Sequence, residues 1–350
     1  MTLPSLSRRT LLGAGGGVAG LWALAGCSTG ESTAGAPAPA PASTASGVTG
    51  TWVTPRALPD GWGSGEDDGV FPRTVVHALG STVIATAPTR VAVLSTGQVD
   101  AALTLGVVPA GSTAGDGADR VPDYLFDAFP EDRAVLEQVA DLGVRTEPSL
   151  EALAVLAPDL ILVNSAAKDA EQLLGTLSAI APTVVTRGTG LYWKQDFQLL
   201  ADALGRRQQA QRWLTDHQDR AAGLGARLSP VPTVSFLRRN GDRTRVFGVA
   251  SFSGSVAEDA GLGRPPTQSF TDDTSRDLSP EQLPLADADW LFFGVQGGDA
   301  TELTSLPLWD PLPVVTAGRA VEVDDDAFYL NTGPTAARLV LDELEATLPA

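Results

Sequence analysis

The sequence predicts an α/β protein in which two Rossmann-like lobes are joined by a single long helix, with a ligand cleft between the lobes. Three observations support this fold class. One segment repeats without a gap, strands and helices alternate on either side of the middle of the chain, and the middle itself has the apolar period of a helix.

The repeat relates residues 149–163 to residues 279–293. Each copy opens on a serine suited to cap a helix and carries a glutamate in the first turn, Glu151 or Glu281. Each copy ends in an apolar run typical of a parallel strand buried on both faces. Two such units imply two similar lobes, each with one exposed carboxylate at an equivalent place.

The first residues have the features of an export signal. Arg8 and Arg9 form a twin-arginine pattern, an apolar Gly-rich stretch follows, and residues 24–27 (Leu-Ala-Gly-Cys) match a lipobox. We therefore predict a signal peptide over residues 1–26 and diacylation of Cys27. Cys27 is the single cysteine, so an intramolecular disulfide and a cysteine-ligated metal are excluded.

The charge balance limits the partners. Arg8 and Arg9 lie in the signal, so 22 of the 24 basic residues remain beside 42 acidic ones, which opposes binding to nucleic acid or to anionic lipid. No apolar run after Cys27 reaches the ~20 residues that a membrane-spanning helix needs. We expect an extracytoplasmic monomer that is held at the cell membrane by its lipid anchor.

Residues 27–70 are predicted to be a lipid-anchored flexible linker. Up to about Thr51 the linker is rich in Ala, Pro, Ser, Thr and Gly, which is typical of an extended spacer. From Trp52 to Gly69, tryptophans and an acidic cluster leave two alternatives: this part packs on the folded domain, or it stays loose.

Residues 71–190 are predicted to form the N-terminal lobe. Apolar segments on both sides of Gly80 indicate a hairpin, and the βαβ pattern that follows indicates a parallel sheet. Besides a helix over 98–105, we expect strands over 74–79, 81–85, 90–94, 107–111, 160–163 and 183–186.

Residues 191–229 are predicted to be a helical connection. It contains a helix over 196–204 and a longer one over 206–228, whose apolar residues recur at three- and four-residue steps. One helix that runs from lobe to lobe allows only small hinge motion.

Residues 230–350 are predicted to form the C-terminal lobe. The expected elements are strands over 233–238 and 244–249, a helix near 255–260, the second repeat copy, apolar stretches at 314–316 and 320–323, and a terminal helix over 334–348.

Short motifs in a fixed order carry a family resemblance. They are PTRVAVLSTGQVD at 88–100, ALTLGVVPAG at 102–111, PSLEAL at 148–153 with PDLILV at 158–163, ALGR at 203–206, LSPEQL at 278–283, and PLWDPL at 307–312 with VEVD at 321–324. On these motifs the chain resembles, over about residues 75–348, the class III substrate-binding proteins of ABC importers, the group that takes ferric siderophores, haem and vitamin B12. The resemblance implies two α/β lobes with the ligand in the groove between them.

The resemblance also implies a role for the two repeated glutamates. In that family, one surface glutamate per lobe docks onto arginines of the two-fold permease, and these roles fall on Glu151 and Glu281. A carboxylate in the first turn of a helix is favoured by the helix dipole alone. Its occurrence in both repeat copies favours docking on an ABC importer permease.

The ligand is expected at the carboxyl ends of the strands, where open α/β sheets bind their ligands. On the first lobe these ends are followed by Ser95–Gly97, Ser112–Ala114 and Asn164–Ser165. In the resembled family, the regions that here hold Trp193 and Tyr329 often face the groove.

Five residues are predicted to contact the ligand. The polar contacts are Arg187, Arg245 and Tyr329, and the apolar walls are Trp193 and Phe252.

A bare metal site is not expected. His77 and His217 are too far apart in the predicted layout to share an ion, and three tyrosines are few for a tyrosine-rich ferric site. We expect no intrinsic cofactor, with iron arriving as a ferric siderophore. The acidic balance favours neutral or cationic hydroxamate or mixed chelators over triply anionic catecholates.

Other functions stay open. Haem would need Tyr192 or Tyr329 as an axial ligand, because the initiator is the only methionine. Cobalamin, or a ligand-sensing lipoprotein with the same fold, is a further alternative. No nucleophile elbow, phosphate loop, His-Glu metal helix or dinucleotide turn occurs in the mature sequence, so an enzyme is not expected.

Overall fold

The computed structural model describes residues 53–115, 117–166 and 169–349, which lie within one compact unit of the chain, residues 45–350. The predicted signal peptide and Cys27 lie outside the described residues. Among the described helices, none is long and apolar enough to cross a membrane.

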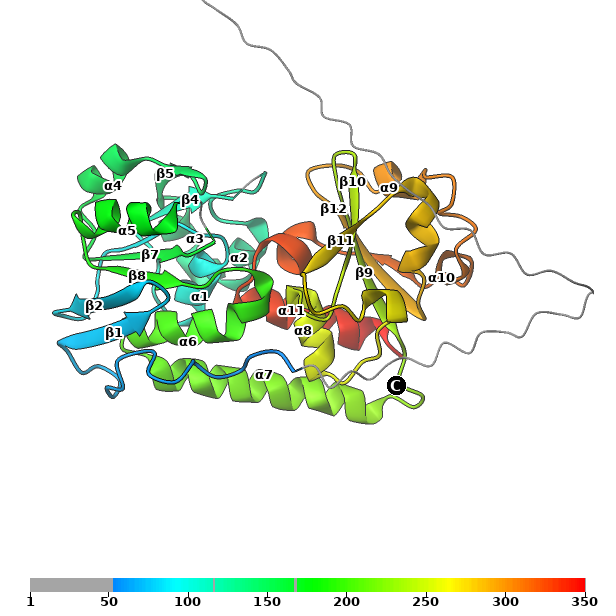
Figure 1. The fold of residues 1–350 in the computed structure, drawn as a ribbon, viewed down its shortest axis with the longest axis horizontal. Helices are drawn as coiled ribbons and strands as arrows, with labels where there is room; N and C mark the ends of the chain where they lie inside the picture. Colours follow the sequence, from blue (N-terminus) through cyan, green and yellow to red (C-terminus); the bar gives the residue numbers. More distant parts are fainter. Residues whose placement is uncertain (1–52, 116, 167–168, 350) are drawn as a thin grey trace, which may run out of the picture. The chain divides into compact units, whose positions relative to one another are not determined.

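The first lobe is built on a six-stranded sheet in the order β6-β5-β4-β3-β7-β8, which is parallel except for β6 (Figure 1). A separate hairpin of β1 (Arg73–His77) and β2 (Gly80–Ile84) turns close to Gly80, as the sequence predicts. The sheet strands are β3 (Val91–Val93), β4 (Gly111–Ala114), β5 (Ala140–Val144), β6 (Glu147–Pro148), β7 (Leu160–Asn164) and β8 (Thr183–Thr186). The helices of this lobe are α1 (Gln98–Thr104), α2 (Asp123–Ala128), η1 (Pro130–Asp132), α3 (Arg133–Leu136), α4 (Leu150–Leu156) and α5 (Ala170–Ser178).

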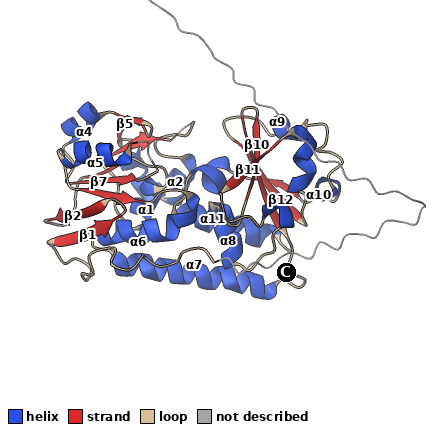
Figure 2. Ribbon diagram, in the orientation of Figure 1, coloured by secondary structure: helices blue, strands red, loops and turns tan. Residues whose placement is uncertain are grey.

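The second lobe is built on a five-stranded mixed sheet in the order β11-β10-β9-β12-β13, with helices around it (Figure 2). Its strands are β9 (Val234–Asn240), β10 (Arg243–Phe247), β11 (Ser275–Leu278), β12 (Trp290–Val295) and β13 (Ala320–Glu322). Its helices are α8 (Phe252–Asp259), η3 (Pro266–Gln268), η4 (Pro280–Ala286), α9 (Thr301–Thr304), α10 (Pro313–Thr316), the π-helix η5 (Asp326–Leu330) and α11 (Pro334–Thr347).

The repeat occupies equivalent places in the two sheets. β7 lies between β3 and β8, β12 lies between β9 and β13, and each is parallel to both of its neighbours. The two-lobed α/β prediction is confirmed. One detail differs: the helix of the second copy, η4, is a 3₁₀ helix with Pro284 inside it, whose ring would clash with the carbonyl four residues earlier in an α-helix.

One further expected strand differs from the sequence prediction. The strand expected over 107–111 begins only at Gly111, after Pro109, which cannot donate to a ladder. The apolar stretch at 314–316 is the helical turn α10, whereas 320–323 contains β13 as a strand.

The connection between the lobes consists of η2 (Gly190–Tyr192), α6 (Trp193–Ala203) and α7 (Arg207–Arg227). In Figure 1, α7 runs along one side of both lobes. Its buried residues recur at helical steps, as predicted, and are Ala210, Leu214, His217, Ala221 and Leu224.

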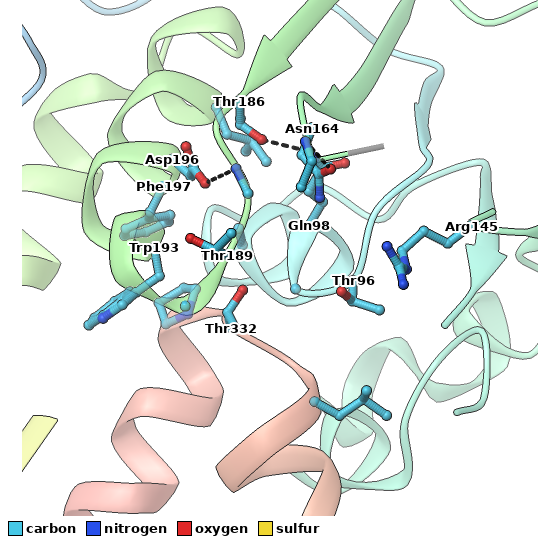
Figure 3. A pocket seen from close by; sticks show the side chains of 18 of the residues that line it. Thr96, Gln98, Arg145, Asn164, Thr186, Thr189, Trp193, Asp196, Phe197 and Thr332 are labelled. Atoms are coloured by element: carbon cyan, nitrogen blue, oxygen red, sulfur yellow. Dashed lines mark hydrogen bonds between the residues drawn. The ribbon is translucent and has the colours of Figure 1, made fainter. Parts of the chain in front are cut away.

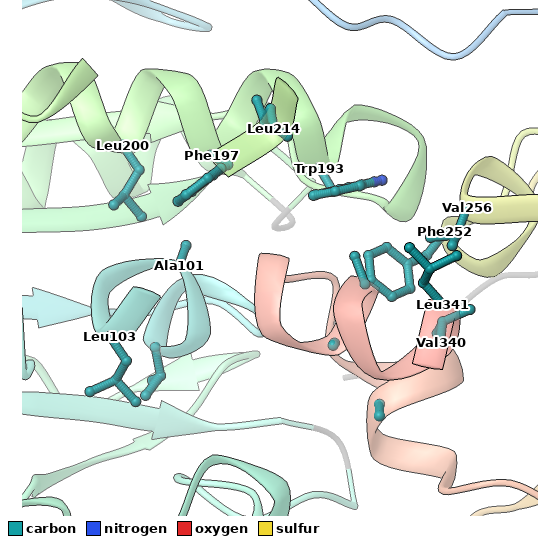
Figure 4. Close-up of a cluster of buried hydrophobic side chains, with 14 of the residues drawn as sticks. Ala101, Leu103, Trp193, Phe197, Leu200, Leu214, Phe252, Val256, Val340 and Leu341 are labelled. Atoms are coloured by element: carbon teal, nitrogen blue, oxygen red, sulfur yellow. The ribbon is translucent and has the colours of Figure 1, made fainter. Parts of the chain in front are cut away.

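One hydrophobic core continues from lobe to lobe and includes Trp193 (Figure 4). The Trp193 ring meets the rings of Trp213 and Phe252 edge to face, at 6.3 and 5.6 Å between centroids. Its Nε1 donates to the Ser255 hydroxyl of α8 at 2.8 Å. The next residue of α6, Lys194, forms a buried ion pair with Asp259 at the end of α8, at 2.5 Å.

The buried carboxylate of Asp100 joins α1 to α11. Its two oxygens accept the backbone N–H groups of Thr335 and Ala336 at 2.7 and 2.9 Å, and one of them also accepts the Tyr124 hydroxyl at 3.0 Å. These bonds satisfy donors that the first turn of a helix leaves free. A Cβ on Gly333 would lie 2.3 Å from the Asp100 carboxyl carbon, so only glycine permits this approach.

The described part of the predicted linker, residues 53–70, packs on the folded domain rather than staying loose. Arg56 pairs with Asp259 at 2.9 Å, and the backbone N–H of Ser64 donates to Asp202 of α6 at 2.7 Å. The segment therefore contacts both the connection between the lobes and α8.

His217 is a buried titratable group in this core. Its ring stacks on Trp213, with 5.1 Å between centroids and an interplanar angle of 13°. Burial, with smaller contributions from Lys194 and Arg220, lowers the pKa of His217 from 6.5 to about 3. The folded protein therefore holds a neutral imidazole at pH values where an unfolded chain would hold a charged one.

We predict that replacing His217 by phenylalanine changes the acid stability of the protein. His217 must stay neutral in the folded state, so its titration reduces stability as the pH falls from 6.5 towards 3. The stability of the wild type relative to His217→Phe should fall by up to about 1.4 kcal/mol per pH unit in that range and stay constant above pH 7.5. Urea unfolding followed by circular dichroism measures both.

Phe197→Leu, a change in the same cluster that alters no titratable group, is the control. Its stability difference from the wild type should not depend on pH. A His217→Phe difference that is equally flat from pH 4 to pH 8 would contradict the prediction.

Candidate functional site

A cavity of about 290 Å³ lies where the first lobe meets the start of α11. The first lobe contributes lining from α1 and from the ends of β7 and β8, and the connection contributes lining from η2 and α6. Further lining comes from η5 and the start of α11 (Figure 3). Thr96, Gly97 and Asn164, which the sequence places at the carboxyl ends of strands, line this cavity.

The wall formed by residues 187–190 is held in place by Asp196. One oxygen of this carboxylate accepts the N–H of Arg187 and the other accepts the N–H of Gly188, both at 2.9 Å. Burial raises the pKa of Asp196 to about 7, and the two backbone donors oppose that shift. Gly188 has a φ of +73°, and a Cβ there would lie 2.7 Å from the Asn164 side chain, so the wall requires glycine at this position.

The floor of the cavity is neutral and polar. Gln98 and Asn164 are both buried. The Gln98 amide donates from Nε2 to the Thr186 hydroxyl at 3.3 Å, and the Thr186 hydroxyl donates to the Val163 carbonyl at 3.4 Å. These groups can give and accept hydrogen bonds without carrying charge.

The opposite side of the cavity comes from the segment between η5 and α11. Gly97, with a φ of +81°, lies so close to this segment that a Cβ would be 2.9 Å from the Thr332 backbone nitrogen. Tyr329 lines the cavity, and its hydroxyl donates to the Phe292 carbonyl at 2.8 Å. The cavity thus adjoins both helices that Asp100 joins, since Ala101 of α1 and Pro334 of α11 line it.

Arg145 is the one lysine or arginine among the described residues that line this cavity. It also lines a neighbouring cavity of about 590 Å³, together with residues of α5. Within the described lining, positive charge is therefore limited to Arg145.

The edge of the groove is acidic. A third cavity, of about 490 Å³, is lined by 117–119 of the first lobe and by 296–297 and 324–326 of the second. Burial, followed by the neighbouring carboxylates Asp324, Asp325 and Asp119, raises the pKa of Asp326 to about 6. Arg238 compensates part of this charge through two bonds to Asp325, at 2.7 and 2.6 Å.

The structure brings two of the five predicted ligand contacts, Trp193 and Tyr329, to the cavity of about 290 Å³. Phe252 lies behind the wall, packed on Trp193. The Arg187 guanidinium lies over the rings of Trp62 and Tyr192, 4.9 and 4.6 Å from their centroids. Arg245 lies half-buried on β10, where burial and then Arg238 and Arg243 lower its pKa. A ligand contact by any of the five stays a prediction.

Sequence reasoning missed several lining residues, among them Gln98, Arg145, Thr189, Asp196 and Thr332. Gln98 directly follows residues 95–97, which the sequence places after the end of a strand. Extending that predicted ligand segment by one residue would have included Gln98. Arg145 and Thr332 have no local signal, because only the packing of distant segments brings them to the cavity.

The two repeated glutamates are both exposed. Glu151 follows Ser149, whose hydroxyl accepts the Ala152 N–H, and Glu281 follows Ser279, whose N–H donates to the Gln282 side chain. The backbone N–H of Glu281 and the Ser279 hydroxyl hold the pKa of Glu281 below its usual value, so this carboxylate is ionised at neutral pH.

An exposed aliphatic residue accompanies each glutamate at the same place in the repeat. Val155 lies four residues after Glu151 and is 81% exposed, and Leu285 lies four residues after Glu281 and is 40% exposed. They are two of the nine large hydrophobic residues that are exposed in the described part of the chain, and what sets them apart is their equivalent place in the repeat.

Within the residues that the structure describes, no group of three or more His, Cys, Asp or Glu side chains could hold a metal ion. His77 lies on β1 and His217 on α7.

Comparisons with known proteins agree with this geometry. The family model described as "Periplasmic binding protein" matches residues 91–327. The chain is 33% identical to the probable siderophore-binding lipoprotein YfiY of Bacillus subtilis, over 78% of this chain and 86% of that protein. It is 30% identical to the achromobactin-binding periplasmic protein of Dickeya dadantii, over 73% of this chain and 85% of that protein.

The fold also matches a solved structure. The crystal structure of Staphylococcus aureus SirA complexed with staphyloferrin B superimposes with a TM-score of 0.67 at 26% identity, over 78% of this chain and 97% of that one.

Proposed function

The chain belongs to the periplasmic binding protein family, whose members are substrate-binding proteins of ABC importers and not enzymes, and from that premise we propose that it binds a ferric chelate outside the cytoplasm and delivers it to a membrane permease. The cavity at the joint between the lobes carries this proposal. Its lining combines neutral hydrogen-bonding groups with an aromatic wall, which suits an organic chelate better than a bare ion.

The chelator we favour is of the hydroxamate or mixed type. The described floor holds Gln98, Asn164 and Thr186, all neutral, and its one described cation is Arg145. Asp119 and Asp326 line the acidic cavity at the edge of the groove. A triply anionic catecholate chelate would meet these carboxylates with little compensating charge, whereas a neutral or cationic chelate would not.

Haem is a weaker candidate on this geometry. Tyr329 is the tyrosine that lines the described cavity, and its hydroxyl is buried and donates to a backbone carbonyl. An axial ligand to haem iron would have to give up that bond.

We predict that intrinsic fluorescence titration of the protein identifies the ligand class. Ferrioxamine E, a neutral trihydroxamate chelate, should give saturable quenching, whereas a triscatecholate chelate, haem and cobalamin should bind more weakly. Because Trp193 lines the cavity, Trp193→Phe should reduce the amplitude of quenching.

Trp309→Phe is the matched control. Trp309 packs on Phe293 in the core of the second lobe, so its replacement should change the amplitude less. Tightest binding of haem or cobalamin, or no binding of ferrioxamine E, would contradict the hydroxamate proposal.

We propose that Glu151 and Glu281 dock the protein on the permease. The matched aliphatic residues Val155 and Leu285 support this, since each lobe then offers one acid beside one exposed apolar side chain. A two-fold partner with an arginine beside an apolar patch on each half would fit both lobes.

We predict that the double change Glu151→Arg and Glu281→Arg reduces uptake of the chelate to background, because two attractive charge pairs become repulsive. Affinity for the chelate in solution should stay within about twofold, as both positions lie on the surface. Radioactive iron uptake and fluorescence titration measure the two effects.

Asp216→Arg with Asp219→Arg, at exposed positions of α7, makes the same change in net charge and should leave uptake intact. Normal uptake by the double glutamate variant would contradict the docking role of Glu151 and Glu281.

We further propose that a diacylated Cys27 holds the protein at the cell membrane. The lipobox in the sequence and the name of the Bacillus subtilis relative, a lipoprotein, support this. A Cys27→Ala variant should move from the membrane fraction to the soluble fraction, whereas Ser28→Ala should not. Recovery of Cys27→Ala in membranes would contradict the anchor.

A further inference from the structure

Thr189 holds a backbone conformation that threonine rarely adopts. Its φ is +64° and its ψ is 151°, a combination that is found almost only in glycine. The β-branched side chain of threonine makes a positive φ less favourable still. Glycine occupies both neighbouring positions, 188 and 190, and would adopt this conformation at 189 without that cost. The side chain of Thr189 therefore reduces the stability of the fold.

The backbone on both sides of Thr189 is held in place. On one side, the Asp196 carboxylate of α6 accepts the N–H groups of residues 187 and 188, both at 2.9 Å. On the other side, Gly190 packs so closely on α8 that a Cβ there would lie 2.7 Å from the Phe252 backbone nitrogen. A strained residue persists only where its surroundings fix it in this way, and such residues cluster at functional sites.

The Thr189 side chain lies where a ligand can reach it. The residue is exposed and lines the cavity of about 290 Å³, and Figure 3 shows its side chain among the other lining residues. Its hydroxyl makes no hydrogen bond to any other residue that the structure describes. The side chain thus strains the backbone and gives the fold no bond in return, so its role lies with what enters the cavity.

We propose that Thr189 is a ligand-binding residue whose hydroxyl donates a hydrogen bond to an oxygen of the bound chelate. This inference rests on the proposed function and adds a specific contact to it. The iron-binding groups of a ferric chelate are oxygen atoms, which accept hydrogen bonds, and a hydroxyl supplies one donor. Because the turn is fixed before binding, little ordering is required when this bond forms.

The first test is Thr189→Gly, for which stability and binding should change in opposite directions. Glycine removes the strain, so the midpoint of urea unfolding should move to a higher concentration. It also removes the hydroxyl, so the Kd for ferrioxamine E should rise about fivefold, as expected for one hydrogen bond. Urea unfolding followed by circular dichroism and fluorescence titration measure the two effects.

Two further variants separate the hydroxyl from the shape of the side chain. Thr189→Val keeps the β-branched shape and the strain but has no hydroxyl, so it should also bind about fivefold more weakly, with an unchanged unfolding midpoint. Thr189→Ser keeps the hydroxyl and should bind within about twofold of the wild type. Wild-type affinity in Thr189→Val, or equal losses in the valine and serine variants, would overturn the proposal.

Ala157→Gly is the matched control for relief of strain. Ala157 follows α4, has a φ of +49° and does not line the cavity. Its replacement should raise the unfolding midpoint and leave the affinity for ferrioxamine E unchanged. A Thr189→Gly variant that is less stable than the wild type would show that Thr189 is not strained, and the inference would be wrong.

The outcome also distinguishes this inference from the proposed function. Equal binding of ferrioxamine E by the wild type and by Thr189→Val overturns only the role of Thr189. No binding of ferrioxamine E by a wild type with native circular dichroism overturns the proposed hydroxamate ligand, and the inference falls with it.

Discussion

The buried carboxylate of Asp100 is the interaction on which the binding site depends. By accepting two backbone N–H groups at the start of α11, it fixes that helix against α1. Burial alone raises the pKa of Asp100, whereas the backbone and hydroxyl donors lower it. Removing the carboxylate would leave buried donors unpaired, and removing the donors would leave a buried charge, so each half of the joint requires the other.

The joint has consequences for ligand binding and for delivery. Further contacts hold the lobes together beside this joint. Trp193 and Lys194 of α6 bind side chains of α8, and residues 53–70 bind the connection between the lobes. A core shared by both lobes keeps the cavity preformed, so little ordering is required when a chelate binds. It also fixes the spacing of Glu151 and Glu281, which suits recognition by a partner with two arginines at fixed positions.

The parts of the fold that could be predicted from the sequence are those that local pattern determines. The repeat gave β7 and β12, and the helical period gave α7 with its buried face. The site was predicted less well because its lining comes from segments that are far apart in sequence. Trp193 and Tyr329 were expected from a family resemblance, whereas Arg145 and Thr332 reach the cavity only through tertiary packing. The repeat alone predicts two equivalent helices, whereas the helix of the second copy is a 3₁₀ helix that contains Pro284.

The central claim is that the joint at Asp100 holds the two lobes in one arrangement. Its most direct test is the distance between spin labels at Val155→Cys and Asp242→Cys, one on each lobe, in a Cys27→Ala background. The claim predicts one narrow distance distribution that is the same with and without ferrioxamine E and that broadens in Asp100→Ala. A large shift when the chelate binds, together with an unchanged distribution in Asp100→Ala, would contradict it.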